Sequence, residues 1–332
     1  MWKQSSKQRK DDIMRYKQFG NTDLRLSELA VGTWAIGGTG WGDVNEKDSI
    51  DAILTMVEQG VNLIDTAPSY GRGHSEEVVG KAIASCRDRV TLLTKCGIRW
   101  PEEAKYGSSQ PIRDSSRAAI IKQCEESLTR LNTDHIDIYL IHWPDVNTPF
   151  EETVEALNAL KQQGKILYTG ISNFEDDELS KLYDLGAIDV VQFAYSMVNR
   201  SKEEVLKKYA QKGVYTMGYG GLGAGILTGA IRELPKFEAG DARLGFYDFF
   251  EEPKFSKVME LLKTLDQIAE SHQVPVAQVA VNWTTQHSYI GASLTGVRNP
   301  KEALENCSAF DWSLSEDEMA VINQAIDDTV GI

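Results

Sequence analysis

The sequence has few of the features that mark secreted, membrane-spanning or metal-binding proteins. Its 332 residues include only four cysteines, which lie far apart, form no C-x-x-C pair and have no histidine at ligand spacing. We therefore expect free thiols in a reducing cytoplasm and no metal site. The longest apolar runs, such as LAVGTWAIGG, are about half a membrane span. The charged N-terminal stretch has no apolar core of a secretory signal.

Basic residues are also in the minority. The 49 acidic and 35 basic residues give a formal net charge of −14. A field of this sign repels phosphate backbones and anionic lipids, so we expect neither a nucleic-acid nor a membrane partner. No heptad and no exposed apolar stripe stands out, and the oligomeric state is left unpredicted.

Short apolar runs alternate with helical patterns along most of the chain. The expected strands are 29–34, 61–67, 90–96, 136–142, 166–172, 190–195, 214–219 and 291–296. The expected helices between and after them are 47–59, 74–85, 115–131, 150–163, 175–184, 202–212, 255–271 and 300–308. Continuous apolar strands that are each followed by a helix favour a parallel sheet buried on both faces. Eight such units predict an α/β fold, the (β/α)8 TIM barrel.

Four further segments complete the predicted architecture. Residues 16–27 resemble a β-hairpin that caps the bottom of the barrel, and the aperiodic stretch 220–253 is typical of a long functional loop. Two extra helices are expected at 274–286 and 313–326, the second of them after a capping box from Ser315 to Glu318. We expect residues 1–15 to be a flexible extension and 16–332 to be one barrel domain.

Polar side chains stand at the ends of the expected strands, where chemistry gathers in such barrels. Asp65, Lys95 and His142 occupy these ends, and Tyr70 follows five residues after Asp65. Each residue alone has an ordinary structural explanation, such as a helix cap or a solvated charge. Together, Asp65 would keep Lys95 charged, and Lys95 would lower the pKa of Tyr70. Such a tyrosine could exchange a proton with a carbonyl or alcohol oxygen.

These segments resemble the aldo-keto reductases. GVNLIDTAPSYGRGHSEEVVGKAI, LLTKCG and LIHWPD match three separate segments of that family in order, and GTWAIGGTGWG is most similar to its bacterial general-stress-type subgroup. The resemblance extends over residues 16–327 and implies an NAD(P)(H)-dependent oxidoreductase acting on an aldehyde, ketone or sugar carbonyl. It implies that Tyr70 is the general acid/base, that Lys95 and Asp65 tune it, and that His142 positions the carbonyl.

The glycine-rich stretch GYGGLGAGILTG contains a G-x-G-x-x-G match but lacks the context of a Rossmann fingerprint. No helix directly follows the glycines, and no acidic residue closes a following strand. The family resemblance instead implies that Tyr219 stacks on the nicotinamide and that the backbone at Leu222, Gly223 and Gly225 meets the pyrophosphate. The sequence departs from the family pattern at the two residues that follow Tyr219, where glycines replace Ser-Pro.

The remaining cofactor contacts are also implied by the resemblance. Ser172, Asn173 and Gln192 match residues that bind the carboxamide, where neutral polar groups suit a neutral amide. At the adenosine end, the matching residues are Gly296, Arg298, Glu302 and Asn306. Arg298 could pair with a 2′-phosphate, whereas Glu302 would repel one and could accept a ribose hydroxyl. Family frequency favours NADP(H), and NAD(H) is the rival.

Trp34, Trp100 and Trp143 fall at or just past strand ends, so we expect them to line the pocket of a small carbonyl or alcohol substrate. Two other functions remain open. One is a cofactor-binding regulatory subunit with slow turnover, like the channel-associated members of the family. The other is a Schiff-base lyase using Lys95, which requires a neutral lysine and therefore conflicts with Asp65.

Overall fold

Eight parallel strands close into a barrel in the computed structural model, which confirms the predicted (β/α)8 fold. The structure describes residues 13–331 except 39, 42–43, 102–109, 239, 242 and 244. The barrel strands are β3 (Leu29–Gly32), β4 (Leu63–Asp65), β5 (Thr91–Cys96), β8 (Ile136–Ile141), β9 (Ile166–Ser172), β10 (Val190–Ala194), β11 (Tyr215–Tyr219) and β12 (Ala292–Gly296). They pair in this order, and β12 closes the circle on β3.

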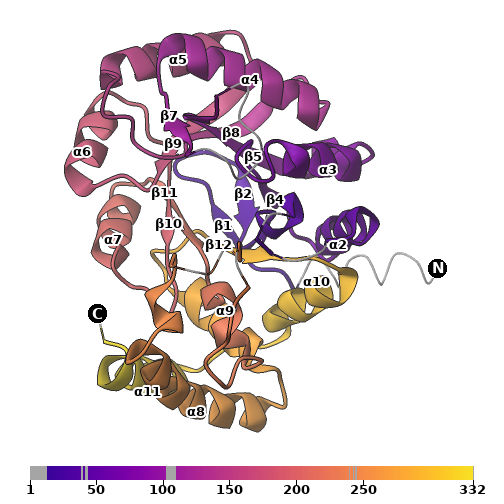
Figure 1. Ribbon diagram of the computed structural model, residues 1–332, viewed down its shortest axis with the longest axis vertical. Coiled ribbons are helices and arrows are strands. Elements are labelled where there is room, and N and C mark those ends of the chain that lie inside the picture. Colours follow the sequence, from indigo (N-terminus) through magenta and orange to yellow (C-terminus); the bar gives the residue numbers. More distant parts are fainter. Residues whose placement is uncertain are drawn as a thin grey trace.

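The helices surround the strands, as Figure 1 shows. They are α2 (Glu46–Glu58), α3 (His74–Ile83), α4 (Arg117–Leu131), α5 (Phe150–Gln162), α6 (Asp176–Asp184), α7 (Glu203–Gln211), α8 (Lys254–His272), α9 (Val276–Gln286), α10 (Pro300–Cys307) and α11 (Glu316–Thr329). All ten predicted helices are present, with ends shifted by at most three residues. Helix α11 packs against α8 at one side of the molecule.

Local sequence signals explain several of the helix ends. Ser315 accepts a hydrogen bond from the backbone N–H of Glu318, whose side chain accepts one from the Ser315 N–H, so the predicted capping box is confirmed. Asn299 caps α10, and Pro300 takes the first helical position, where the missing N–H has no cost. These caps fix where the chain leaves β12 and enters α10.

The apolar residues form two layers. One cluster fills the barrel interior, and a second, larger cluster lies between the strands and the surrounding helices. Alternation along a strand separates the two layers, because neighbouring side chains point to opposite faces. Leu93 thus lies in the interior cluster, while Cys96 lies in the outer one. All four cysteines are buried free thiols.

The predicted N-terminal hairpin closes the bottom of the barrel. Strands β1 (Tyr16–Gln18) and β2 (Arg25–Ser27) pair antiparallel, and Phe19 between them is buried. The Phe19 ring lies 4.7 Å from the ring of Tyr168 and 5.0 Å from that of Tyr215, both near the starts of their strands. The opposite end of the barrel, where the strands finish, is left for the site.

The N-terminal extension and the long loop are only partly described. Residues 1–12 of the predicted extension lie outside the described residues, whereas Arg15 donates to Glu28 at 2.9 Å. The stretch 220–253 contains two short 3-10 helices, η3 (Gly223–Thr228) and η4 (Asp248–Phe250). A two-stranded hairpin of β6 (Ile98–Arg99) and β7 (Ile112–Arg113) was not predicted. Within the described residues, no helix has the length and apolar character needed to cross a membrane.

Candidate active site

The candidate side chains meet at one end of the barrel because of the strand pleat. Each of six candidates lies two positions, or four for Ser172, after a residue that belongs to or packs against the interior cluster, so it faces the interior as well. The six are Asp65, Lys95, His142, Ser172, Gln192 and Tyr219. All of them stand at or near the carboxyl ends of their strands, as the sequence predicted.

Lys95 lies at the centre of this group. Its Nζ donates to the two carboxylate oxygens of Asp65 at 2.8 and 2.7 Å, to the carbonyl oxygen of Thr66 at 3.0 Å and to Oη of Tyr70 at 3.1 Å. Lys95 is completely buried, and Asp65 is nearly so. An ammonium has three hydrogens, and these three groups use them all. Tyr70 therefore accepts from Lys95, and its own hydroxyl hydrogen remains available.

The buried pair shows two opposing effects on protonation. Burial raises the pKa of Asp65 and lowers that of Lys95, while their attraction opposes both shifts. Burial, followed by the charge of Asp65, raises the pKa of Tyr70 well above its ordinary value. The expectation that the pKa of Tyr70 is lowered is therefore wrong, since burial and the Asp65 carboxylate both raise it. Tyr70 holds its proton at neutral pH.

His142 is a neutral imidazole beside Tyr70. The two rings meet edge to face with centroids 5.9 Å apart. Burial, assisted by the charge of Lys95, lowers the pKa of His142 well below its ordinary value. Its Nδ1 lies 3.3 Å from Oγ of Ser69, in the loop after β4. A neutral imidazole can donate one hydrogen bond and accept another, according to its tautomer.

A second polar group connects the ends of β8, β9 and β11. Nδ2 of Asn173 donates to the carbonyl oxygen of His142 and to Oγ of Ser172, each at 3.0 Å. Oδ1 of Asn173 accepts from the hydroxyl of Tyr219 at 2.8 Å. Asn173 has φ +65°, a left-handed conformation that asparagine tolerates better than most residues. Burial raises the pKa of Tyr219 to about 12, so its hydroxyl remains a donor.

Gln192 has a partner that the sequence did not suggest. Its Nε2 donates to Oδ2 of Asp65 at 2.8 Å, and its side chain is buried. The amide therefore supports the Asp65 carboxylate directly, and its possible contact with a cofactor carboxamide stays a prediction.

Aromatic rings line one side of Tyr70. The ring of Trp34 is stacked at 6.2 Å from that of Tyr70, and it also meets the rings of Trp41 at 5.2 Å and Phe246 at 5.9 Å. Phe246 belongs to the long loop after β11 and is half exposed. That loop therefore supplies part of the wall beside Tyr70, as its length and composition suggested.

The other two predicted pocket tryptophans each lie beneath the guanidinium group of an arginine. Arg72 lies over the ring of Trp100 at 5.3 Å, and Arg113 over the ring of Trp143 at 5.1 Å. Both tryptophans are half-buried. Their place in the substrate pocket stays a prediction, while Trp34 alone of the three stacks on Tyr70 among the described ring contacts.

The glycine-rich turn after β11 forms no long helix. Gly220, Gly223 and Gly225 all have positive φ, and the chain continues into η3, which is kinked at Ala224 and Gly225. A side chain at Gly221 would approach Oγ of Ser293 to 2.8 Å, so the turn is packed closely against β12. The rejection of a Rossmann fingerprint is confirmed. Leu222, beside these glycines, is half-buried at the start of η3.

At the predicted adenosine end, the two opposing residues bind each other. Glu302 accepts from the Arg298 guanidinium at 2.8 Å and from the Arg298 backbone N–H at 2.9 Å. Asn306 donates from Nδ2 to the carbonyl oxygen of Gly296 at 3.4 Å. Gly296 is exposed and has space for a side chain. The structure therefore brings all four residues to the connection between β12 and α10.

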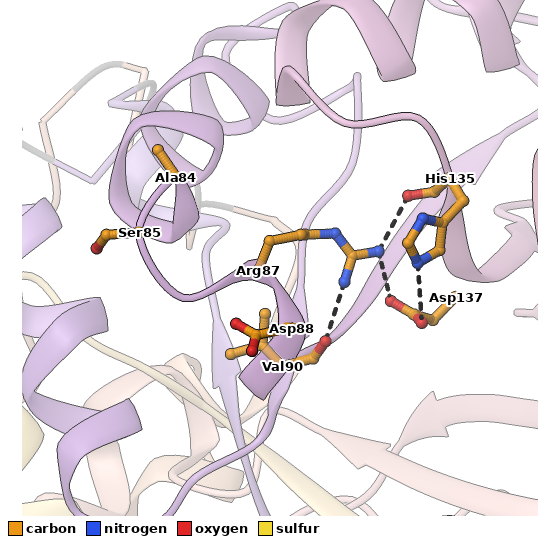
Figure 2. A pocket seen from close by; sticks show the side chains of 7 residues that line it. All are labelled: Ala84, Ser85, Arg87, Asp88, Val90, His135 and Asp137. Carbon is orange, nitrogen blue, oxygen red and sulfur yellow. Dashed lines mark hydrogen bonds and ion pairs between the residues drawn. The ribbon is translucent and has the colours of Figure 1, made fainter.

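A separate cleft of about 390 Å³ opens at the strand starts, away from these residues. Figure 2 shows Arg87 reaching across it to Asp137, with a 2.7 Å ion pair, and to the carbonyl oxygens of Val90 and His135. The Asp137 carboxylate also accepts from the backbone N–H of Leu92 at 2.8 Å. This cleft therefore holds a structural clasp between β5 and β8.

Three residues of the candidate site were not predicted from the sequence. Ser69 could have been noticed because it directly precedes Tyr70, but a serine in a loop carries no specific signal. Trp41 and Phe246 lie in glycine-rich segments without periodicity. Their places beside Trp34 depend on how the loops fold over the barrel end.

Comparisons with known proteins agree with this arrangement. The profile of the Aldo/keto reductase family matches residues 28–327. The chain is 36% identical to Aldo-keto reductase YhdN of Bacillus subtilis (strain 168), over 96% of this chain and 95% of that protein. It is 34% identical to the NADH-specific methylglyoxal reductase of Escherichia coli (strain K12), over 94% and 98%. The structure of a glycerol dehydrogenase from Gluconobacter oxydans superposes with a TM-score of 0.86 at 33% identity, over 96% of each chain.

Proposed function

Because this chain belongs to the aldo/keto reductase family of NAD(P)-dependent oxidoreductases, we propose that it reduces a small aldehyde, ketone or sugar carbonyl with Tyr70 as the general acid. One observation carries the proposal. The hydroxyl oxygen of Tyr70 accepts from Lys95 at 3.1 Å, while Lys95 is held by Asp65 and Thr66. This leaves the Tyr70 proton free to pass to a substrate oxygen.

The protonation states suit reduction. The raised pKa of Tyr70 keeps it protonated at neutral pH, so it can donate to the oxygen that becomes an alcohol. Lys95 then faces the phenolate that remains and stabilises its charge. In the reverse direction, the same phenolate accepts the proton of the alcohol. His142 is neutral and can donate a second hydrogen bond to the carbonyl oxygen, which increases the polarisation of the C=O bond.

The polar groups at the ends of β9, β10 and β11 fit a nicotinamide. Asn173, Ser172 and Gln192 are neutral donors and acceptors, which match a carboxamide, and the Tyr219 ring offers a stacking face. When bound, the cofactor supplies or accepts the hydride. The contribution of the chain is to fix which face of the ring meets the substrate. The backbone at Leu222, Gly223 and Gly225 is proposed to receive the pyrophosphate.

The adenosine end supports NAD(H) more than the sequence suggested. A 2′-phosphate needs Arg298, but Arg298 is already paired with Glu302 at 2.8 Å. Binding of NADP(H) therefore has to displace a carboxylate and then tolerate it nearby, which costs affinity. The family's usual preference for NADP(H) takes no account of the ion pair between Arg298 and Glu302 in this chain. We propose that NADH binds at least as tightly as NADPH.

The wall beside Tyr70 indicates the substrate. Trp34, Trp41 and Phe246 form an aromatic wall, which suits a small carbonyl compound with an apolar or ring-faced body. The Schiff-base alternative is disfavoured, because Lys95 donates to an anion at 2.7 Å and has no free lone pair for attack.

The variant Tyr70→Phe tests the proposal. It keeps the ring and removes the proton, so we expect unchanged NADH binding by fluorescence quenching and a loss of turnover of about 100- to 10,000-fold. Phe246→Leu, in the same wall but without a proton to give, is the control and should change KM more than kcat. Turnover of Tyr70→Phe equal to that of the parent contradicts the proposal. A parent protein that binds NADH but reduces no carbonyl compound supports the regulatory alternative instead.

A further inference from the structure

We propose that Ser69 is a positioning residue that fixes the tautomer of His142, so that Nδ1 accepts a hydrogen bond and Nε2 carries the hydrogen. The consequence for catalysis rests on the proposed function, because it assumes that the imidazole donates to a substrate oxygen. The tautomer itself is a property of the protein alone and can be measured without turnover.

The geometry places the two groups in direct contact. Oγ of Ser69 lies 3.3 Å from Nδ1 of His142, within hydrogen-bond distance. The backbone of His142 is fixed on both sides of the ring, since its N–H donates to the carbonyl oxygen of Cys96 at 2.9 Å and its own carbonyl oxygen accepts from Asn173 at 3.0 Å. The ring is further confined by the edge-to-face contact with Tyr70. The backbone bonds thus fix where the side chain begins, and a turn of the ring would break its contacts with Ser69 and Tyr70.

The direction of the hydrogen bond follows from the donors and acceptors present. A neutral imidazole has one N–H, so Nδ1 either donates to Ser69 or accepts from it. If Nδ1 donated, the hydroxyl hydrogen of Ser69 would need another acceptor, and the described residues provide none. If Ser69 donates to Nδ1, this one bond uses both the hydroxyl hydrogen and the Nδ1 lone pair, and neither depends on solvent. The hydrogen of the imidazole then lies on Nε2.

The position of the hydrogen matters because the two ring nitrogens point in opposite directions. With Nδ1 directed at Ser69, Nε2 points away from it, and no described residue bonds to Nε2. An Nε2–H gives the site a second donor besides the Tyr70 hydroxyl. An unprotonated Nε2 would instead present a lone pair that repels a carbonyl oxygen. The Ser69 hydroxyl therefore decides whether His142 presents an N–H donor or a repulsive lone pair to the carbonyl oxygen.

Nitrogen-15 NMR of the histidine rings tests the inference directly. Two-bond ¹H–¹⁵N spectra distinguish protonated from unprotonated ring nitrogens, and His142→Gln identifies the signals among the five histidines. We expect the Nε2–H tautomer in the parent protein, a mixture of tautomers in Ser69→Ala, and restoration in Ser69→Thr, which keeps the hydroxyl. His135, whose Nδ1 is hydrogen-bonded to Asp134, is the internal control and should not change.

Kinetics give a second, separable readout. We expect Ser69→Ala to lower kcat three- to tenfold, the effect of one neutral hydrogen bond, and to leave NADH binding unchanged. An Nδ1–H tautomer in the parent, or an unchanged tautomer in Ser69→Ala, overturns the inference. If Tyr70→Phe keeps full turnover while the tautomer depends on Ser69, the proposed function fails and this inference stands.

Discussion

Asp65 and Lys95 place two opposite charges in a buried part of the barrel. Among the described residues, the carboxylate has one further donor besides Lys95, the amide of Gln192, so removal of either charge leaves the other buried and poorly compensated. Tyr70 depends on this pair for its position. The Asp65–Lys95 pair thus affects both the free energy of unfolding and the position of the Tyr70 hydroxyl.

We predict that Asp65→Asn lowers the free energy of unfolding by about 3–5 kcal/mol, because it leaves the Lys95 ammonium without its partner. The double variant Asp65→Asn with Lys95→Met should be more stable than Asp65→Asn alone. Urea denaturation of the three proteins measures both effects. Asp51→Asn, which breaks an exposed pair with Lys47, is the control and should cost at most about 1 kcal/mol. A double variant that is no more stable than Asp65→Asn alone would contradict the argument.

The identities of the site residues could be predicted from the sequence, but not their electrostatics. Strand-end positions and the order of the three motifs pointed to Asp65, Tyr70, Lys95 and His142. The direction of the Tyr70 pKa shift depends on how deeply the phenol is buried, which no spacing of residues records. The hydrogen bond from Gln192 to Asp65 joins residues on separate strands through the barrel interior, and it likewise could not be predicted from the sequence.

At the scale of elements, the proposed preference between NADH and NADPH rests on the connection between β12 and α10. Asn299 caps α10 and directs Glu302 back toward Arg298, so helix capping and the ion pair are formed by the same turn. Strands and helices here were predictable because their apolar periods are long and regular. The hairpin of β6 and β7 was not, since two residues per strand carry no period.

We predict that Glu302→Gln binds NADPH about fivefold more tightly, because Arg298 is released and a repulsive charge of about 1 kcal/mol is removed. NADH affinity should change less than twofold. Parallel fluorescence titrations with both cofactors measure this. Glu305→Gln, which removes an equal charge from the same helix, is the control and should alter neither affinity. Unchanged NADPH binding in Glu302→Gln would mean that the 2′-position lies elsewhere.

At the scale of the whole molecule, the contacts that close the strand starts are separated from the candidate site. The hairpin around Phe19 and the clasp of Arg87 with Asp137 hold the strand starts together, and the candidate site occupies the strand ends. This separation was predictable from chain order, because a hairpin before β3 can reach only the bottom. The loop after β11 was predictable as a loop, but its aromatic contact with Trp34 was not.

The last prediction concerns the pH dependence of stability and a buried histidine outside the candidate site. His287 follows α9 and packs against the rings of Trp283 and Tyr289, and its Nε2 is buried without a partner among the described residues. Burial lowers its pKa to about 4, even though Glu203 works in the opposite direction. Arg200, Lys207 and Lys17 add to the lowering.

The sign of the effect follows from proton binding. In the unfolded chain, the pKa of His287 returns to about 6.5, so between pH 6.5 and 4 the unfolded state binds more protons than the folded state. We predict that the free energy of unfolding contributed by His287 is fully present above pH 6.5 and falls by the order of 2–3 kcal/mol toward pH 4. Urea denaturation across this range should show a smaller pH dependence for His287→Gln than for the parent. The comparison cancels other groups, including His142, whose lowered pKa acts in the same direction. Parallel stability curves for the two proteins would show that His287 takes up its proton equally well in both states.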